Sequence, residues 1–106
     1  MRTIWKYELG INDEYQGLYI PSTAMIVHVD MASRDDDMGV GLWVELETGH
    51  VITRPRVFKV VGTGHDNPDG TYVGTAVGNL FEWHVYEVFG QVAEWYCSRL
   101  LSGSAW

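Results

Sequence analysis

The sequence predicts a mainly β protein: a small antiparallel barrel or sandwich of about six to seven strands with one C-terminal α-helix. Apolar and polar residues alternate along most of the chain, which is the period of a strand with one buried face. Glycine, asparagine and aspartate separate the alternating runs, and these residues favour turns. After residue 88 the apolar residues fall at helical spacing instead. The length of 106 residues fits a single domain.

The strands expected in the first half of the chain are short. They cover residues 5–11, 18–20, 25–30 and 40–47, and a turn or loop follows the third at 33–39. The fourth alternates most regularly. Its apolar face carries Val40, Leu42, Val44 and Leu46, and its opposite face carries Trp43, Glu45 and Glu47.

A hairpin is expected where the fourth strand ends. The dipeptide Thr48-Gly49 offers a two-residue turn, because glycine tolerates positive φ. The fifth strand then covers residues 51–61, and in this register Trp43 faces Arg54. Pro55 has no amide proton, so the strand is expected to be an edge there or to carry a bulge.

The second half of the chain contains two further strands and the helix. A loop at 65–70 precedes a strand at 71–77, Gly78-Asn79 predicts a second hairpin turn, and a last strand covers 80–88. Within that strand, alternation places Phe81 and Trp83 on the same face. Residues 1–88 therefore form a β domain, residues 89–101 a helix packed on it or on a partner chain, and residues 102–106 a tail.

Charge and composition exclude several classes of function. The formal net charge of −7 argues against general binding to nucleic acid, which needs a basic surface. No apolar run approaches the ~18 residues of a membrane-spanning helix, and the first residues lack the apolar segment of a signal peptide. We therefore expect a cytoplasmic protein without membrane contact. Because Cys97 is the single cysteine, no intrachain disulfide can form.

The end of the fifth strand is the best candidate for a ligand site. The run Gly62-Thr63-Gly64-His65 predicts a turn whose amides can hold an anion. Arg54 and Arg56 share a strand face and can grip a phosphate. The candidate anion or nucleotide site consists of Arg54, Arg56, Lys59, Gly62, Thr63, Gly64 and His65. The competing interpretation is that both arginines form ion pairs with Glu45 and Glu47 across the expected hairpin.

Other chemistry has less support in the sequence. His65, His84 and Glu82 can hold a metal if the fold brings them together, but their spacing is not diagnostic. The run Asp35-Asp36-Asp37 lacks the alternating ligands of a calcium loop. No His or Lys lies close to Cys97 in sequence to lower its pKa, so a partly buried structural role is expected. We expect no metal, no cofactor and no catalytic residue.

Aromatic residues exceed what a core of this size needs. The chain contains five Trp and six Tyr, and these residues are enriched at interfaces. The candidate partner-binding residues are Trp43, Glu45 and Glu47 on the fourth strand and Trp95 and Tyr96 on the helix. The helix either docks on the β domain or mediates self-association into a homo-oligomer.

Several segments occur in an order that resembles a known family. They are Ile4-Trp5-Lys6-Tyr7-Glu8-Leu9, Leu42-Trp43, Arg56-Val57-Phe58, Val60-Val61-Gly62-Thr63-Gly64-His65, Tyr72-Val73-Gly74-Thr75 and Phe81-Glu82-Trp83-His84-Val85-Tyr86-Glu87. Over residues 3–88 the chain is similar to a family of short bacteriophage and prophage proteins of unknown function. The family pattern is a Lys-Tyr-Glu opening, a Gly-Thr-Gly-His turn and a Trp-His closing strand. The resemblance implies a viral context and no catalytic residues, and the helix after residue 88 departs from it.

Together these features favour a non-catalytic phage accessory protein over an enzyme. The leading hypothesis is an inhibitor that counters host defence by covering a functional site on a host protein, as small acidic anti-CRISPR proteins do. The second hypothesis is an oligomeric sponge that sequesters a phosphate-bearing signalling nucleotide at Arg54, Arg56 and the turn at 62–65. A metal-assisted hydrolase that uses His65 and His84 is a third hypothesis, and a minor virion component is a fourth.

Overall fold

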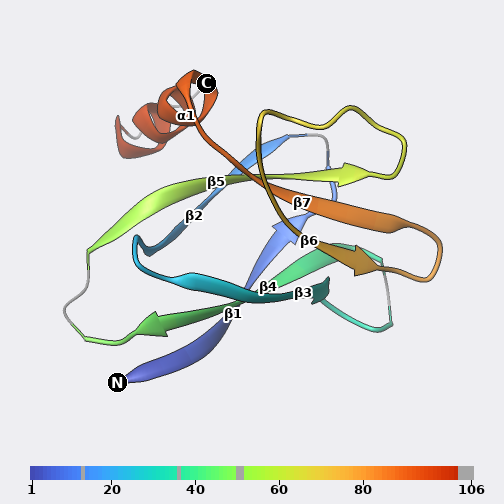
Figure 1. Cartoon of the computed structure of the whole chain (residues 1–106), viewed down its shortest axis with the longest axis horizontal. Coiled ribbons are helices and arrows are strands. Elements are labelled where there is room, and N and C mark those ends of the chain that lie inside the picture. Colours follow the sequence, from blue (N-terminus) through green and yellow to red (C-terminus); the bar gives the residue numbers. More distant parts are fainter. Residues whose placement is uncertain (13, 36, 50–51, 103–106) are drawn as a thin grey trace.

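The computed structural model describes residues 1–12, 14–35, 37–49 and 52–102 (Figure 1). In this part of the chain the elements are β1 (Arg2–Gly10), β2 (Tyr15–Pro21), β3 (Met25–Met31), β4 (Gly39–Glu47), β5 (Thr53–Gly62), β6 (Gly70–Val77), β7 (Glu82–Val88) and α1 (Gln91–Ser102). The expected mainly β fold with a C-terminal helix is confirmed. Among the described residues, no helix has the length and apolar character needed to cross a membrane.

The strands form two antiparallel sheets that pack face to face as a sandwich. Sheet 1 has the order β1-β4-β3 and sheet 2 the order β2-β5-β7-β6. Figure 1 shows sheet 1 in the lower half of the molecule, sheet 2 above it, and α1 on the far side of sheet 2. The sheets are not closed into a barrel, so the sandwich is the correct one of the two expected architectures.

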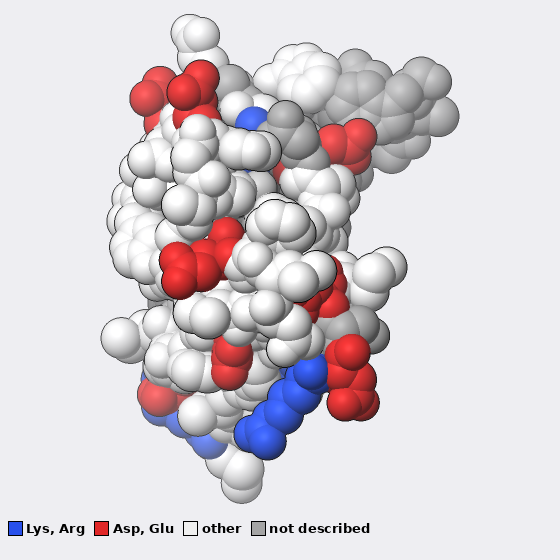
Figure 2. Space-filling view, turned by 90° about the vertical axis from the view of Figure 1, so that its right-hand side faces the viewer, with Lys and Arg blue, Asp and Glu red and all other residues white. Residues whose placement is uncertain are grey.

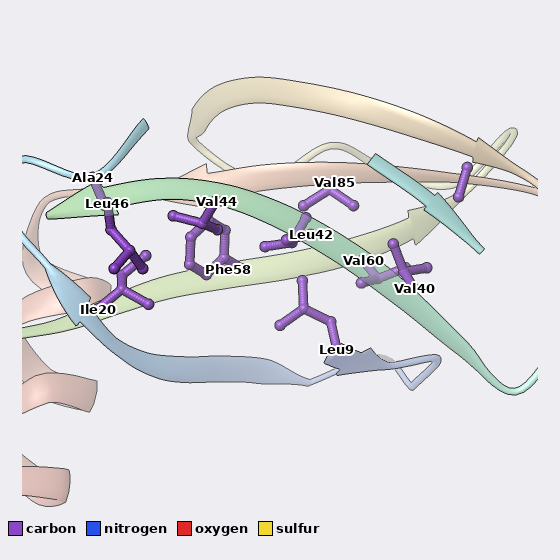
Figure 3. Close-up of a cluster of buried hydrophobic side chains, with 11 residues drawn as sticks. Leu9, Ile20, Ala24, Val40, Leu42, Val44, Leu46, Phe58, Val60 and Val85 are labelled. Carbon is purple, nitrogen blue, oxygen red and sulfur yellow. The ribbon is translucent and has the colours of Figure 1, made fainter. Parts of the chain in front are cut away.

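The hydrophobic core lies between the two sheets, as Figure 3 shows. Alternation of apolar residues determines which side chains enter it, because successive side chains of a strand point to opposite faces. The apolar face of β4 is buried as expected, and Phe58 and Val60 of β5 meet it from sheet 2. The buried cluster consists of Leu9, Ile20, Ala24, Val40, Leu42, Val44, Leu46, Phe58, Val60, Ala76 and Val85.

The expected hairpin between the fourth and fifth strands is wrong. β4 is the central strand of sheet 1, where Trp43 pairs with Lys6 and His28. β5 lies in sheet 2, where Arg54 pairs with Ile20. The chain crosses between the sheets after Glu47, so the apolar faces of β4 and β5 stack across the core instead of lying side by side. The expected partner of Leu46, Val51, lies outside the described residues.

The second hairpin is confirmed, with a longer loop. β6 and β7 pair antiparallel up to Val77 opposite Glu82. The amide of Gly78 donates to the Phe81 carbonyl oxygen at 2.9 Å, which closes a four-residue connection. The edge expected at Pro55 is also confirmed, because pairing of β5 with β7 begins only at Val57.

One side of the sandwich is closed by contact between a glycine and a valine. Gly74 on β6 lies against Val29 on β3, so closely that a Cβ atom at Gly74 would stand 2.7 Å from Val29 Cγ2. Real Cβ atoms do not approach other atoms this closely without displacing them. The absence of a side chain at Gly74 therefore determines how near the two sheets approach each other along these edges.

A nearly buried ion pair ties the sheets together at the end next to α1. Arg56 Nε and Nη2 each donate to a carboxylate oxygen of Glu87 at 2.8 Å, and Arg56 Nη1 donates to the Ala24 carbonyl oxygen at 2.9 Å. The two side chains are 19% and 12% exposed. Ala24 lies in the turn that carries the chain from β2 in sheet 2 to β3 in sheet 1. One guanidinium therefore joins two strands of sheet 2 to the crossing between the sheets.

The contact at Gly74 can be tested by adding one methyl group. Gly74→Ala is expected to lower the free energy of unfolding by about 1–3 kcal/mol, the usual cost of overpacking. Val29→Ala in the same chain removes the clash and is expected to restore part of the loss. Chemical denaturation of the three variants measures this, and additive losses in the double variant would contradict the contact.

The ion pair can be tested by removing one partner. Arg56→Met is expected to cost about 3 kcal/mol of unfolding free energy, because it leaves the Glu87 carboxylate nearly buried without its cation. The combined Arg56→Met and Glu87→Leu change is expected to cost less than the single change. The matched control is Arg2→Met, which breaks an exposed pair with Glu45 and is expected to change urea denaturation far less. Equal losses for Arg56→Met and Arg2→Met would contradict the structural role of the buried pair.

Candidate functional site

The structure separates the residues of the candidate anion site along one strand. Arg54 lies eight residues before Gly62 on β5, which corresponds to about 26 Å at ~3.3 Å per residue. Arg54 is exposed beside α1, at the opposite end of β5 from the turn at 62–65. Lys59 lies between them on the outer face of sheet 2, with its Nζ 4.9 Å from the centre of the Tyr15 ring. These groups therefore do not converge on one phosphate-sized space.

The arginines do not pair with the glutamates of the fourth strand, so that interpretation is wrong. Arg56 is bound to Glu87 and is not presented to a ligand. Glu45 accepts from Arg2 Nε at 2.8 Å, and Glu47 accepts from the N-terminal ammonium of Met1 at 3.1 Å. The physical reason is the strand order, since β1 rather than β5 lies beside β4.

The candidate partner-binding residues lie on opposite sides of the sandwich. Trp43, Glu45 and Glu47 share the outer face of sheet 1, as their alternation predicts. There Trp43 lies between Lys6, whose Nζ is 5.3 Å from the ring centre, and His28, whose ring centre is 5.1 Å away. Trp95 and Tyr96 belong to α1, beyond the outer face of sheet 2 (Figure 1). One partner surface does not include both groups.

The turn at 62–65 and the start of β7 form one unit. The amide of His65 donates to the Gly62 carbonyl oxygen at 3.1 Å, and Gly64 has φ +91°, which is a type II turn with glycine at its third position. Thr63 Oγ1 and His84 Nε2 are 2.8 Å apart. A Cβ atom at Gly62 would lie 3.3 Å from the Trp83 ring.

His84 is held from both sides on the outer face of sheet 2. Its Nδ1 is 2.9 Å from Thr75 Oγ1 on β6, and Thr75 Oγ1 also contacts the hydroxyl of Tyr72. Each ring nitrogen of His84 therefore lies within hydrogen-bond distance of a threonine hydroxyl. The network fixes the turn at 62–65 to the two strands beside it. The Gly-Thr-Gly-His and Trp-His segments, distant in sequence, therefore meet in space.

Several connections gather at the end of the sandwich that contains this turn. We define the loop end as residues 32–35, 37–38, 62–66 and 77–82, and Figure 2 looks onto it. Asp37 accepts from the amides of Asn79 and Leu80, both at 3.1 Å. Thr63 lines a shallow hollow together with residues 77–82. An aspartate from the β3–β4 connection thus fixes the backbone of the β6–β7 connection.

The loop end presents large apolar side chains to solvent. The exposed fractions are 76% for Met38, 64% for Val77, 81% for Leu80 and 60% for Phe81. The Phe81 ring centre lies 5.8 Å from that of Trp83, so the aromatic ring is supported by a partly buried one. The sequence prediction missed this patch because it placed residues 80 and 81 inside the last strand. An apolar pair directly after Gly78-Asn79 was the available signal.

The other candidate chemistry is not assembled in the described part of the chain. No group of three or more His, Cys, Asp or Glu side chains there could hold a metal ion. Asp36, one of the three consecutive aspartates, lies outside the described residues. Burial raises the pKa of the Cys97 thiol, and the positive charge of Arg54 offsets this in part. The thiol donates to the Pro55 carbonyl oxygen at 3.4 Å, where it helps to attach α1 to sheet 2.

Comparison with known proteins identifies the family. Residues 1–94 match the family described as domain of unknown function (DUF7352). Because the match covers most of the chain, the protein belongs to this family. No curated protein and no solved structure matches it significantly. The match ends within α1, before Trp95 and Tyr96.

The two hydrogen bonds from the loop amides of Asn79 and Leu80 to Asp37 can be tested by hydrogen exchange. Hydrogen bonds to a charged acceptor typically contribute about 1.5–3 kcal/mol, so Asp37→Ala is expected to speed exchange of the amides of Asn79 and Leu80 by about tenfold or more. Asp35→Ala is the matched control, because it removes an exposed carboxylate from the same connection. Unchanged exchange at both amides in Asp37→Ala would show that the loop is fixed by other contacts.

Proposed function

We propose that this member of the DUF7352 family is a non-catalytic bacteriophage accessory protein that binds and blocks a host protein in the host cytoplasm. The phage context is supported by the resemblance of residues 3–88 to short phage and prophage proteins. A host defence protein is the proposed target, since blocking such a protein needs binding and no chemistry. The proposed contact surface is the loop end.

The observation that carries this proposal is an exposed apolar patch on a fixed backbone. Leu80 and Phe81 point into solvent although solvent exposure of large apolar groups is unfavourable. Asp37 accepts from the consecutive amides of Asn79 and Leu80, and Trp83 supports the Phe81 ring. Exposed apolar patches of this kind mark sites of association with other proteins.

The fixed backbone matters for the affinity that such a patch can reach. Burying a Leu or Phe side chain contributes about 1.5–3 kcal/mol. Ordering a flexible loop on binding would consume much of that gain, and a loop that is ordered beforehand avoids this cost. A few well-placed apolar anchors therefore suffice to dominate the binding energy of an interface.

A nucleotide sponge, a hydrolase and a virion component have less support. A nucleotide sponge would need Arg54 and Arg56 beside the turn at 62–65, whereas Arg56 is bound to Glu87 at the far end of β5. A hydrolase would need His84 directed at a substrate or a metal, whereas both of its ring nitrogens contact threonine hydroxyls. No specific observation favours a virion component.

The proposal predicts that polar substitutions in the patch abolish binding without unfolding the protein. Leu80→Ser and Phe81→Ser are each expected to weaken capture of the host target by about tenfold to a hundredfold. Immobilised protein is incubated with host lysate, and retained proteins are quantified by mass spectrometry. Thermal unfolding midpoints are expected to match the wild type because both side chains lie in solvent.

Ile52→Ser is the matched control, since Ile52 is also 81% exposed. It lies in the connection between β4 and β5, at the opposite end of the sandwich (Figure 1). It is expected to retain full capture. A folded wild-type protein that enriches no host protein, or capture that survives both substitutions at the loop end, would overturn the proposal.

A further inference from the structure

Acidic residues outnumber basic ones in the three connections of the loop end. Five charged residues are described in its connections. Four are acidic, namely Asp35, Asp37, Asp66 and Glu82, and one is basic, Arg34. Glu82 lines the same hollow as Val77, Leu80 and Phe81. Figure 2 shows Asp and Glu distributed over the whole of this face, including beside the Lys and Arg surface at its lower edge.

Three of these carboxylates are available to a partner. The Asp37 carboxylate already accepts hydrogen bonds from two backbone amides of the β6–β7 connection. Asp35, Asp66 and Glu82 are exposed. We call these three residues the acidic rim. Glu82 borders the apolar patch, and the basic Arg34 lines a neighbouring hollow together with Val77.

We infer that the partner surface is a single-stranded nucleic-acid-binding groove on the host protein. The inference rests on the proposed function and names the chemistry of its target. Such a groove combines positive charges that follow a phosphate backbone with aromatic or apolar platforms that stack on bases. The acidic rim complements the positive charges, and Leu80 and Phe81 complement the platforms. The two properties lie next to each other in the loop end, as phosphates and bases do in a single strand.

Other occupants fit the loop end less well. In a two-fold dimer through this surface, the acidic rims of two copies would face each other, and the chain carries a formal net charge of −7. Anionic lipid headgroups and nucleic acid would be repelled by the same carboxylates. A purely apolar groove would leave Glu82 desolvated next to the patch without a counter-charge.

The test uses the whole chain with a photo-reactive side chain at the patch. Leu80 is replaced by p-benzoylphenylalanine, the protein is irradiated in host lysate, and the cross-linked protein is identified. The cross-linking is repeated with an excess of 30-residue oligothymidylate as competitor. We expect cross-linking to fall by at least tenfold with the competitor, and the cross-linked peptide to lie in a groove rich in Lys and Arg.

A second experiment tests the contribution of charge by neutralising one of two glutamates in turn. Glu82→Gln removes one charge of the acidic rim, and Glu94→Gln removes one exposed charge on α1 as the matched control. Charges at the edge of an interface mainly change the association rate and its dependence on salt. We expect Glu82→Gln to slow association with the purified target severalfold and to flatten its salt dependence, and Glu94→Gln to change neither.

The outcomes separate the two proposals. A cross-linked protein that oligothymidylate does not displace, or an association rate unaffected by Glu82→Gln, would overturn the inference about the groove while leaving the binding function intact. A folded protein that cross-links to nothing would overturn both. Displacement by oligothymidylate together with the change at Glu82 supports the inference, because a contact outside the groove would produce neither.

Discussion

The fold depends on one nearly buried ion pair. Arg56 and Glu87 lie on the two central strands of sheet 2, and the guanidinium also binds the turn that leads into sheet 1. A pair this shielded is costly to desolvate, and it is maintained only when all its partners are in place. It therefore fixes the register of β5 against β7. That same register brings Val61 and Gly62 beside His84 and Trp83 at the other end of the strands, where the turn at 62–65 is attached.

The elements could be predicted from the sequence, whereas their pairing could not. The alternation of apolar and polar residues along β4 shows which face of that strand is buried, and it can be read from the sequence of β4 alone. That sequence does not show which strands pair with β4. Thr48-Gly49 has the composition of a hairpin turn, but β1 and β3 already occupy both edges of β4. The partner of Arg56 also depends on strand order. The sequence predicts an acidic partner, but this partner is Glu87 rather than Glu45 because β7 lies beside β5.

The candidate site was foreseen in part for a related reason. The turn at 62–65 was recognisable from its glycines, and His84 from its place in the last strand, but their contact follows from strand order alone. Leu80 and Phe81 were missed because the expected last strand begins at residue 80, whereas β7 begins at Glu82. Their exposure results from Asp37, a residue of the other sheet's connection, which holds the loop in a four-residue form. No local pattern contains that information.

The position of β7 also has a consequence for how the chain reaches this structure. β7 is the last strand to be synthesised, yet it lies between β5 and β6 and pairs with both. While the chain grows on the ribosome at about 5–20 residues per second, β5 and β6 have no common neighbour until residues 82–88 emerge. β7 can then pair locally with β6 as a hairpin, and sheet 2 is completed when β7 of this hairpin pairs with β5. Until that moment two strand edges stay open, and a β7 from a second nascent chain fits them equally well, so crowded translation favours exchange of this strand between chains.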